Sequence, residues 1–78
     1  MLENKPKIQI VIELMENNYD PNSFIEDKKL DYVDVIYEAS KQNMDITNLV
    51  KNNNMSKQQI ALKIAKKNLN PMDFIRIY

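Results

Sequence analysis

A pattern of eight residues occurs three times in this chain, at a constant spacing of 25 positions, in residues 18–25, 43–50 and 68–75. Each copy has an Asn, an apolar residue and then Asp or Asn, followed four positions later by two adjacent apolar residues. A fixed period of 20 to 50 residues is typical of stacked supersecondary units, none of which can bury its apolar face alone. The repeat therefore predicts three similar units, approximately residues 6–30, 31–55 and 56–78, in one domain spanning residues 1–78.

Each copy has the features of a helix end followed directly by a helix start. Asn18, Asn43 and Asn68 stand where a helix must end, and Asn is the best substitute for Gly in a left-handed conformation. The chain contains no Gly. The Asp or Asn two residues later can cap the next helix, and Pro21 and Pro71 suit its first position. We therefore expect an all-α fold of three helical hairpins, each a long helix, an Asn turn and a short helix, stacked as a small helical-repeat bundle.

Periodicity and capping signals set the expected bounds of the six helices. Ser56 and Gln59 form a capping-box pattern for the third long helix, and the run of Asn at 52–54 is the clearest break. Residues 1–5 carry no helical pattern. Long helices are expected at residues 7–17, from Asp31 to Asn43 and from Ser56 onward, and short helices at residues 21–28, 46–51 and 71–78.

Superposing the three copies gives columns that are apolar throughout and therefore predict the core. The columns are Val11, Ile36 and Ala61; Leu14, Ala39 and Ile64; Tyr19, Met44 and Leu69; Phe24, Leu49 and Phe74; and Ile25, Val50 and Ile75.

Composition excludes several kinds of chemistry. The chain has no Cys, His, Gly or Trp, which excludes disulfides, zinc sites with Cys or His ligands, phosphate loops built on Gly, and Ser-His or Cys-His nucleophile pairs. Only carboxylates remain as acid–base groups, and no sequence pattern arranges a partner or a metal around them. We therefore expect no enzymatic activity, no cofactor and no metal. No apolar run approaches the ~18 residues of a membrane span, and the start of the chain lacks signal-peptide features, so we expect a cytoplasmic protein with no membrane partner.

The net charge of zero conceals an asymmetry between the two halves of the chain. Residues 1–39 contain nine acidic residues and four lysines, a net charge of −5. Residues 40–78 contain two aspartates against six lysines and one arginine, a net charge of +5. An electrically polar molecule of this kind favours a charged partner at each end, or head-to-tail contact between copies, although solvated outer helix faces would also give this distribution.

The last residues form a dense apolar cluster at a place where a repeat array normally presents polar residues. Ile77 and Tyr78 have no apolar equivalents in the earlier copies, where polar or charged residues stand. The cluster predicts either a surface for a protein partner or a second copy, or closure onto the first hairpin. The candidate interface residues are Met72, Ile75, Arg76, Ile77 and Tyr78.

A second candidate surface is basic. Residues 56–61 are similar to the opening of a DNA-binding helix-turn-helix, and Lys57, Lys63, Lys66 and Lys67 could meet phosphates or an acidic partner. The residues from position 71, where a recognition helix would have to lie, contain only one cation, and the whole chain is neutral. The sequence therefore does not favour a nucleic-acid partner, and a transcription-associated nucleic-acid-binding module is the alternative function.

Residues 35–49 resemble the short helical hairpin of the Sin family, the repressor and anti-repressor pair of spore-forming bacteria. The shared features are an apolar pair, Glu-Ala, a helix-ending Asn, an aliphatic residue, a capping position and a later aliphatic residue. Residues 64–75 match more loosely. The resemblance implies homodimers or an inhibitory heterodimer and no catalysis. We therefore expect a small non-catalytic protein-binding module, an inhibitor or antagonist of a regulatory protein in a bacterial or phage setting, whose partner is that regulator or a second copy.

Overall fold

The computed structural model describes residues 6–78, so the patternless residues 1–5 lie outside the described part. Residues 6–78 contain six α-helices and no strand, as expected of an all-α fold. The molecule measures 37 × 23 × 22 Å. The helices are α1 (Lys7–Glu16), α2 (Asn22–Asp27), α3 (Tyr32–Lys41), α4 (Thr47–Asn53), α5 (Lys57–Lys66) and α6 (Met72–Ile75).

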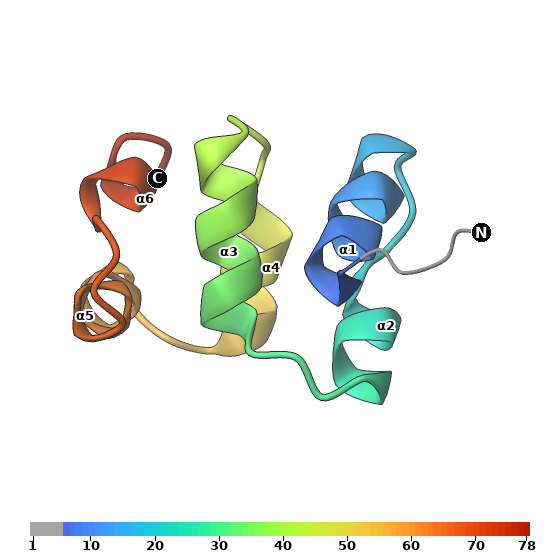
Figure 1. Ribbon diagram of the computed structural model, residues 1–78, viewed down its shortest axis with the longest axis horizontal. Coiled ribbons are helices and arrows are strands. Elements are labelled where there is room, and N and C mark those ends of the chain that lie inside the picture. The colour runs from blue at the N-terminus through green and yellow to red at the C-terminus, as the bar shows by residue number, and fades with distance from the viewer. Residues whose placement is uncertain (1–5) are drawn as a thin grey trace.

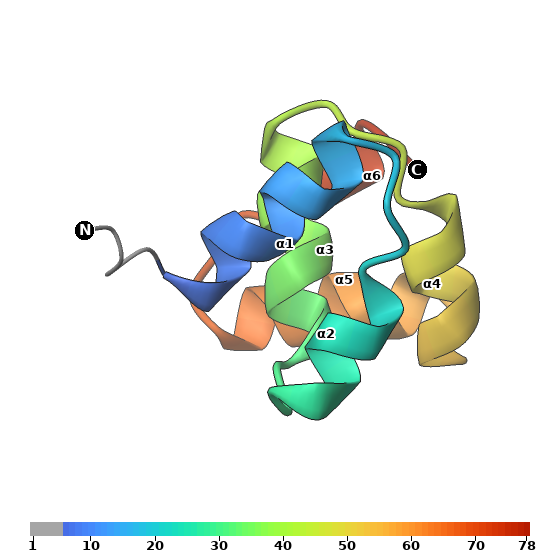
Figure 2. The ribbon, with the colours of Figure 1, turned by 90° about the vertical axis from the view of Figure 1, so that its right-hand side faces the viewer.

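The helices follow one another along the longest axis of the molecule. Figure 1 shows α1 and α2 at one end, α3 and α4 in the middle, and α5 and α6 at the other end. The view in Figure 2, turned by 90°, looks along this axis from the α1 end. The middle helix α3 packs against α1 on one side and against α5 and α6 on the other. It is therefore buried on several faces, and its buried residues are Val33, Val35, Ile36, Ala39 and Ser40.

The three turns that follow the long helices contain the expected left-handed Asn residues. Asn18, Asn43 and Asn68 have φ values of 64°, 60° and 64°. Two further residues with positive φ, Lys29 at 55° and Asn54 at 60°, were not predicted. They also lie 25 positions apart, and each ends a short helix. The chain thus reverses direction at Asn or Lys in the absence of Gly.

The expected N-caps are confirmed at the starts of the helices. Asp20, Asp45 and Asn70 each accept a hydrogen bond through Oδ1 from the backbone N–H two residues later, at 3.0 Å in every case. Ser56 and Gln59 form the capping box at the start of α5. These bonds satisfy backbone donors that have no partner within the helix, so each cap fixes where its helix begins.

Two predicted helix ends were wrong. The helix expected at residues 46–51 was to end before the Asn run at 52–54. Helix α4 continues instead through Asn53 and is followed by the left-handed Asn54. The last helix stops at Ile75 and does not reach Tyr78. The backbone N–H groups of Ile77 and Tyr78 both bind the carbonyl oxygen of Phe74, at 3.0 Å each, so the chain ends in a tighter turn.

Most residues of the predicted core columns are buried or partly buried, but one residue near each end of the molecule is exposed. Ile25 and Val50 are buried, but Ile75 in the same column is 37% exposed. Tyr19, which was expected to be buried as the chain reverses, is 66% exposed, whereas Met44 in its column packs partly against the core. Tyr19 and Ile75 belong to the first and last helix pairs (Figure 1), and no further helix of residues 6–78 covers them.

Candidate functional site

Exposed large apolar side chains gather at the end of the molecule formed by α5 and α6. Of the five such residues in the described chain, only Tyr19 lies elsewhere. We call the other four the C-terminal surface: Leu62, Met72, Ile75 and Tyr78, with exposed fractions of 58%, 59%, 37% and 43%. Three of the five predicted interface residues therefore lie on this surface.

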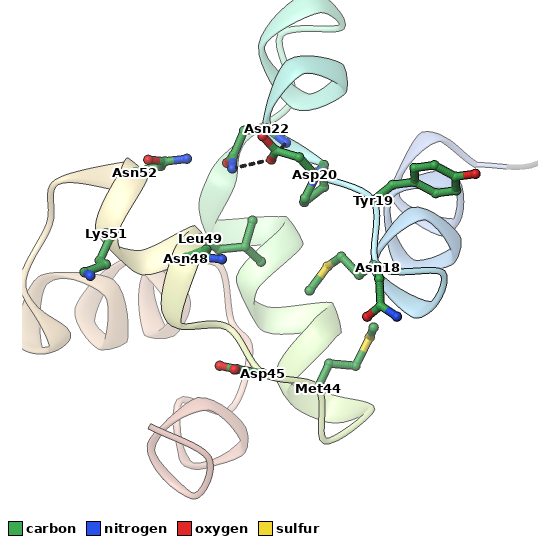
Figure 3. Close-up of a pocket in the computed structure, with 12 residues that line it drawn as sticks. Asn18, Tyr19, Asp20, Asn22, Met44, Asp45, Asn48, Leu49, Lys51 and Asn52 are labelled. Carbon is green, nitrogen blue, oxygen red and sulfur yellow. Dashed lines mark hydrogen bonds between the residues drawn. The ribbon is translucent and has the colours of Figure 1, made fainter.

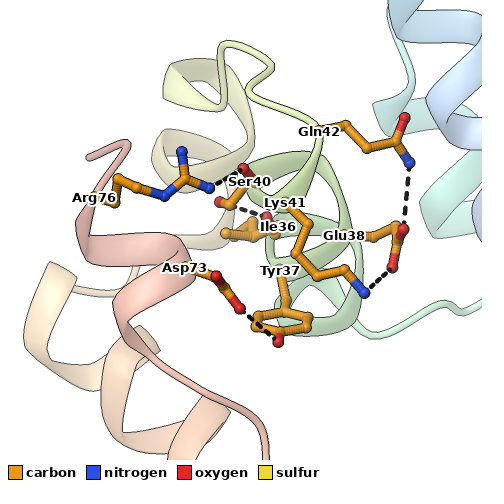
Figure 4. Close-up of polar contacts among 8 residues, drawn as sticks. All are labelled: Ile36, Tyr37, Glu38, Ser40, Lys41, Gln42, Asp73 and Arg76. Atoms are coloured by element: carbon orange, nitrogen blue, oxygen red, sulfur yellow. Dashed lines mark hydrogen bonds and ion pairs between the residues drawn. The ribbon is translucent and has the colours of Figure 1, made fainter.

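The other two predicted interface residues take part in the fold. Ile77 is partly buried and packs against the core. Arg76 is exposed, but its Nη1 donates to Asn43 Oδ1 at 2.6 Å. Its Nη2 approaches the Ser40 carbonyl oxygen at 3.5 Å (Figure 4). Both contacts join the last residues to the end of α3. Closure onto the first hairpin is not observed, because α6 lies at the opposite end of the molecule from α1 and α2 (Figure 1).

A second polar contact holds α6 on α3. The Tyr37 hydroxyl donates to Asp73 Oδ2 at 2.9 Å (Figure 4). This hydrogen bond, together with partial burial, raises the pKa of Tyr37. The ring of Tyr78 stacks on that of the buried Phe74, with centroids 5.7 Å apart. The C-terminal surface is therefore presented by a short segment that is fixed to the body of the molecule.

The predicted basic face is partly engaged within the molecule. Lys67 Nζ lies 3.0 Å from Asp31 Oδ2 and 3.1 Å from Asp34 Oδ1. The hydrogen bond to Asp31, followed by that to Asp34, raises the pKa of Lys67. The positive charge of Lys63 also helps to lower the pKa of Asp31. Lys57 is half-buried and Lys66 is exposed. The structure thus places two of the four lysines beside the acidic start of α3.

A cleft of about 560 Å³ that the sequence did not predict lies between the turn after α1 and helix α4 (Figure 3). One wall comes from the end of α1 and the start of α2: Met15, Asn18, Tyr19, Asp20, Pro21 and Asn22. The other comes from the turn after α3 and from α4: Met44, Asp45, Asn48, Leu49, Lys51 and Asn52. Its volume falls within the ~300–1,000 Å³ range of ligand sites.

The polar groups in the cleft are amides and carboxylates. Asp45 accepts hydrogen bonds from the backbone N–H and then the hydroxyl of Thr47, and these lower its pKa, so the carboxyl is ionised at neutral pH. Asp20 accepts two hydrogen bonds from Asn22 through the same oxygen, Oδ1 (Figure 3). The sequence signal for this cleft was present in the repeated Asn and Asp turn residues. From their pattern alone, those residues were predicted only to end and cap helices.

No group of three or more Asp or Glu side chains within residues 6–78 is arranged to hold a metal ion. Within the same residues, no helix combines the length and the apolar character that crossing a membrane requires.

The chain matches no protein-family model, and neither a curated protein nor a solved structure matches it.

Proposed function

We propose that this protein is a non-catalytic protein-binding module that acts through its C-terminal surface. The single observation that carries the proposal is the gathering of Leu62, Met72, Ile75 and Tyr78 at one end of the molecule. Exposed apolar side chains scattered singly are normal, but a group of them at one site marks an interaction surface. Aromatic residues and Met are also enriched in protein interfaces.

The charge around this surface defines the kind of partner. Residues 40–78 carry a net charge of +5, and Lys63, Lys66 and Arg76 lie on or near α5 and α6. A partner with an apolar patch and an acidic rim would complement both features. This proposal retains the inhibitor or antagonist role toward a bacterial or phage regulator that the Sin-type hairpin resemblance implies.

A repeat architecture supports the same proposal. We infer three stacked hairpins, because α1, α3 and α5 have ten residues each and begin at positions 7, 32 and 57. In the middle unit, Tyr37 contacts Asp73 of the next unit and Val50 is buried. Their equivalents in the last unit are the exposed Leu62 and Ile75. Within residues 6–78 no further unit covers the C-terminal surface, and a partner packs there as the next unit of a stack would.

The alternative function, nucleic-acid binding, has less support. Lys67 already has two carboxylate partners, and Lys63 lies in the field of one of them. These acids would repel the phosphates that the lysines have to attract, and each phosphate contact depends on free cationic charge.

Affinity capture from the source cell tests the proposal. The bait proteins are the wild type, a triple variant (Met72→Ser, Ile75→Asn, Tyr78→Asn) and the control Tyr19→Ser, which removes a still more exposed aromatic residue at the other end. We expect the wild type and the control to retain the same partner, and the triple variant to lose it, since buried aromatic and aliphatic anchors dominate interface energies. Capture of that partner by the triple variant would contradict the proposal.

Light scattering on the same three proteins identifies the other possible partner, a second copy of the chain. A dimer that the triple variant alone dissociates would assign the C-terminal surface to self-association. The thermal stability of the triple variant has to remain close to that of the wild type, because the three side chains are exposed.

A further inference from the structure

The turn after α1 and the turn after α3 have the same backbone conformation and carry the same kinds of hydrogen-bond acceptor. Asn18 and Asn43 both have positive φ, and their backbone N–H groups bind Met15 O at 3.1 Å and Ser40 O at 3.0 Å. The N–H groups of the next residues, Tyr19 and Met44, bind the carbonyl oxygens of Leu14 and Ala39, at 2.9 and 3.0 Å. Each turn therefore offers an amide Oδ1 atom and a helix-ending carbonyl oxygen as neighbouring acceptors.

In the turn after α3 these acceptors are occupied by a guanidinium. Arg76 Nη1 donates to Asn43 Oδ1 at 2.6 Å. Its Nη2 lies 3.5 Å from Ser40 O (Figure 4). The forked guanidinium suits two acceptors held side by side. The molecule thus contains an occupied example of the site.

In the turn after α1, the residues that carry the corresponding acceptors line the cleft. Asn18 and Met15 both line it, and Asn18 Oδ1 receives no hydrogen bond from any residue within 6–78. The residue equivalent to Arg76 is Lys51, on the α4 wall of the cleft (Figure 3). The turn after α3 is occupied because α6 packs closely on α3. The turn after α1 is not, because the cleft separates α4 from the end of α1.

The other groups in the cleft favour a cation with an apolar stem. Asp20 and Asp45 use Oδ1 in their capping bonds, so within residues 6–78 each keeps Oδ2 for another donor. With two carboxylates and one lysine, Lys51, the lining of the cleft carries a net negative charge. Met15 and Met44 offer apolar contact to methylene groups, and the exposed ring of Tyr19 can stack on a guanidinium.

We infer that this cleft binds the guanidinium of an arginine side chain presented by another polypeptide. Asn18 Oδ1 and Met15 O accept from it as Asn43 and Ser40 accept from Arg76, and the two carboxylates supply the charge. The cleft is larger than one side chain, and the amides of Asn48 and Asn52 lie within it for the ligand's backbone groups. The site goes beyond the proposed function, because it involves none of the residues of the C-terminal surface.

Amide chemical-shift titration with short blocked peptides tests the inference. The probes are acetyl-Gly-Arg-Gly-amide and its Lys and citrulline counterparts. We expect saturable shifts around Asn18 and Asp45 with the Arg peptide, at a dissociation constant on the order of 1 mM. Citrulline removes the charge and Lys removes the fork, so both peptides bind at least about tenfold more weakly. Equal binding of all three peptides, or shifts mapping away from the cleft, would overturn the inference.

A pair of variants supplies the control. Asn18→Gly removes the acceptor and keeps the left-handed turn, because Gly adopts positive φ freely. Asn68→Gly makes the same change at the third turn, which does not line the cleft. We expect Asn18→Gly to weaken Arg-peptide binding about tenfold and Asn68→Gly to leave it unchanged; unchanged binding by Asn18→Gly would contradict the site. Partner capture by Asn18→Gly stays at the wild-type level, which separates this site from the C-terminal surface.

Discussion

Arg76 Nη1 lies 2.6 Å from Asn43 Oδ1, and this hydrogen bond joins residues 33 positions apart. It connects the end of the chain to the turn after α3, the helix on which α6 packs. Together with the Tyr37–Asp73 hydrogen bond at 2.9 Å, it orients the segment that carries the C-terminal surface.

The first prediction concerns this bond. Arg76→Ala is expected to lower the free energy of unfolding by about 1 kcal/mol, the usual net value of one hydrogen bond. Arg76→Lys is expected to recover only part of the loss, because Lys lacks the planar fork. Urea denaturation measures both. Lys51→Ala, at the equivalent exposed position one repeat earlier, is the control and is expected to change stability by less than about 0.5 kcal/mol. Equal losses from Arg76→Ala and Lys51→Ala would show that the bond contributes nothing specific.

The second prediction compares a buried and an exposed leucine. Leu49 is 2% exposed and Leu62 is 58% exposed. Leu49→Ala is expected to cost roughly 2–4 kcal/mol, as for a buried aliphatic residue, and Leu62→Ala less than about 0.5 kcal/mol. Thermal and urea unfolding of the two variants measure the difference. A loss below about 0.5 kcal/mol for Leu49→Ala would mean that its column is not part of the core.

Local features of this fold could be predicted from the sequence because their causes lie within a few residues. The left-handed conformation of Asn43 and the capping bond of Asp45 depend on side chains and backbone groups of the same turn. The capping box of Ser56 and Gln59 is local in the same way. Six helices with nearly correct starting points followed from these signals.

Features that depend on how the helices pack could not be predicted in this way. The column containing Ile25, Val50 and Ile75 is apolar throughout, yet only the first two are buried, since burial requires a neighbouring helix pair. The cleft exists because α4 does not close on α1 as α6 closes on α3. That difference rests partly on Arg76, whose partner Asn43 is remote in sequence.

The third prediction uses the two unexpected left-handed residues. Lys29 has φ 55°, a conformation that Asn adopts at lower cost than Lys. Lys29→Asn is expected to raise the free energy of unfolding by about 0.5 kcal/mol. The reciprocal change, Asn54→Lys at the equivalent position, is expected to lower it by a similar amount. Unfolding curves in urea measure both changes. If neither variant moves the unfolding midpoint, backbone strain at these turns is negligible.

The fourth prediction concerns the pH dependence of stability at the start of α3. Partial burial acts to raise the pKa of Asp31, but the hydrogen bonds from Lys67 and from the Val33 N–H outweigh it and lower that pKa. The stability from Asp31 is therefore present above its ordinary pKa of 3.8 and is lost as the pH falls through the lower folded value. The pKa of Lys67 is raised, so its contribution is present below 10.5 and is lost as the pH rises further.

Melting temperatures of the wild type and of Lys67→Gln, measured from pH 2 to pH 11, check this prediction. The wild type is expected to be the more stable protein across the neutral range, and the difference is expected to shrink at both extremes. Because the groups are largely exposed, added salt should reduce it as well. A difference that stays constant across the pH range would show that Lys67 acts through packing and not through its charge.

The most direct test of the central claim is hydrogen exchange on the complex with the captured partner. If the C-terminal surface is the binding site, amides of residues 57–78 gain protection on binding, and those of α1 and α2 exchange as in the free protein. The triple variant at Met72, Ile75 and Tyr78 then shows no protection at the same partner concentration. Protection confined to α1 and α2, with residues 72–78 unchanged, would contradict the claim.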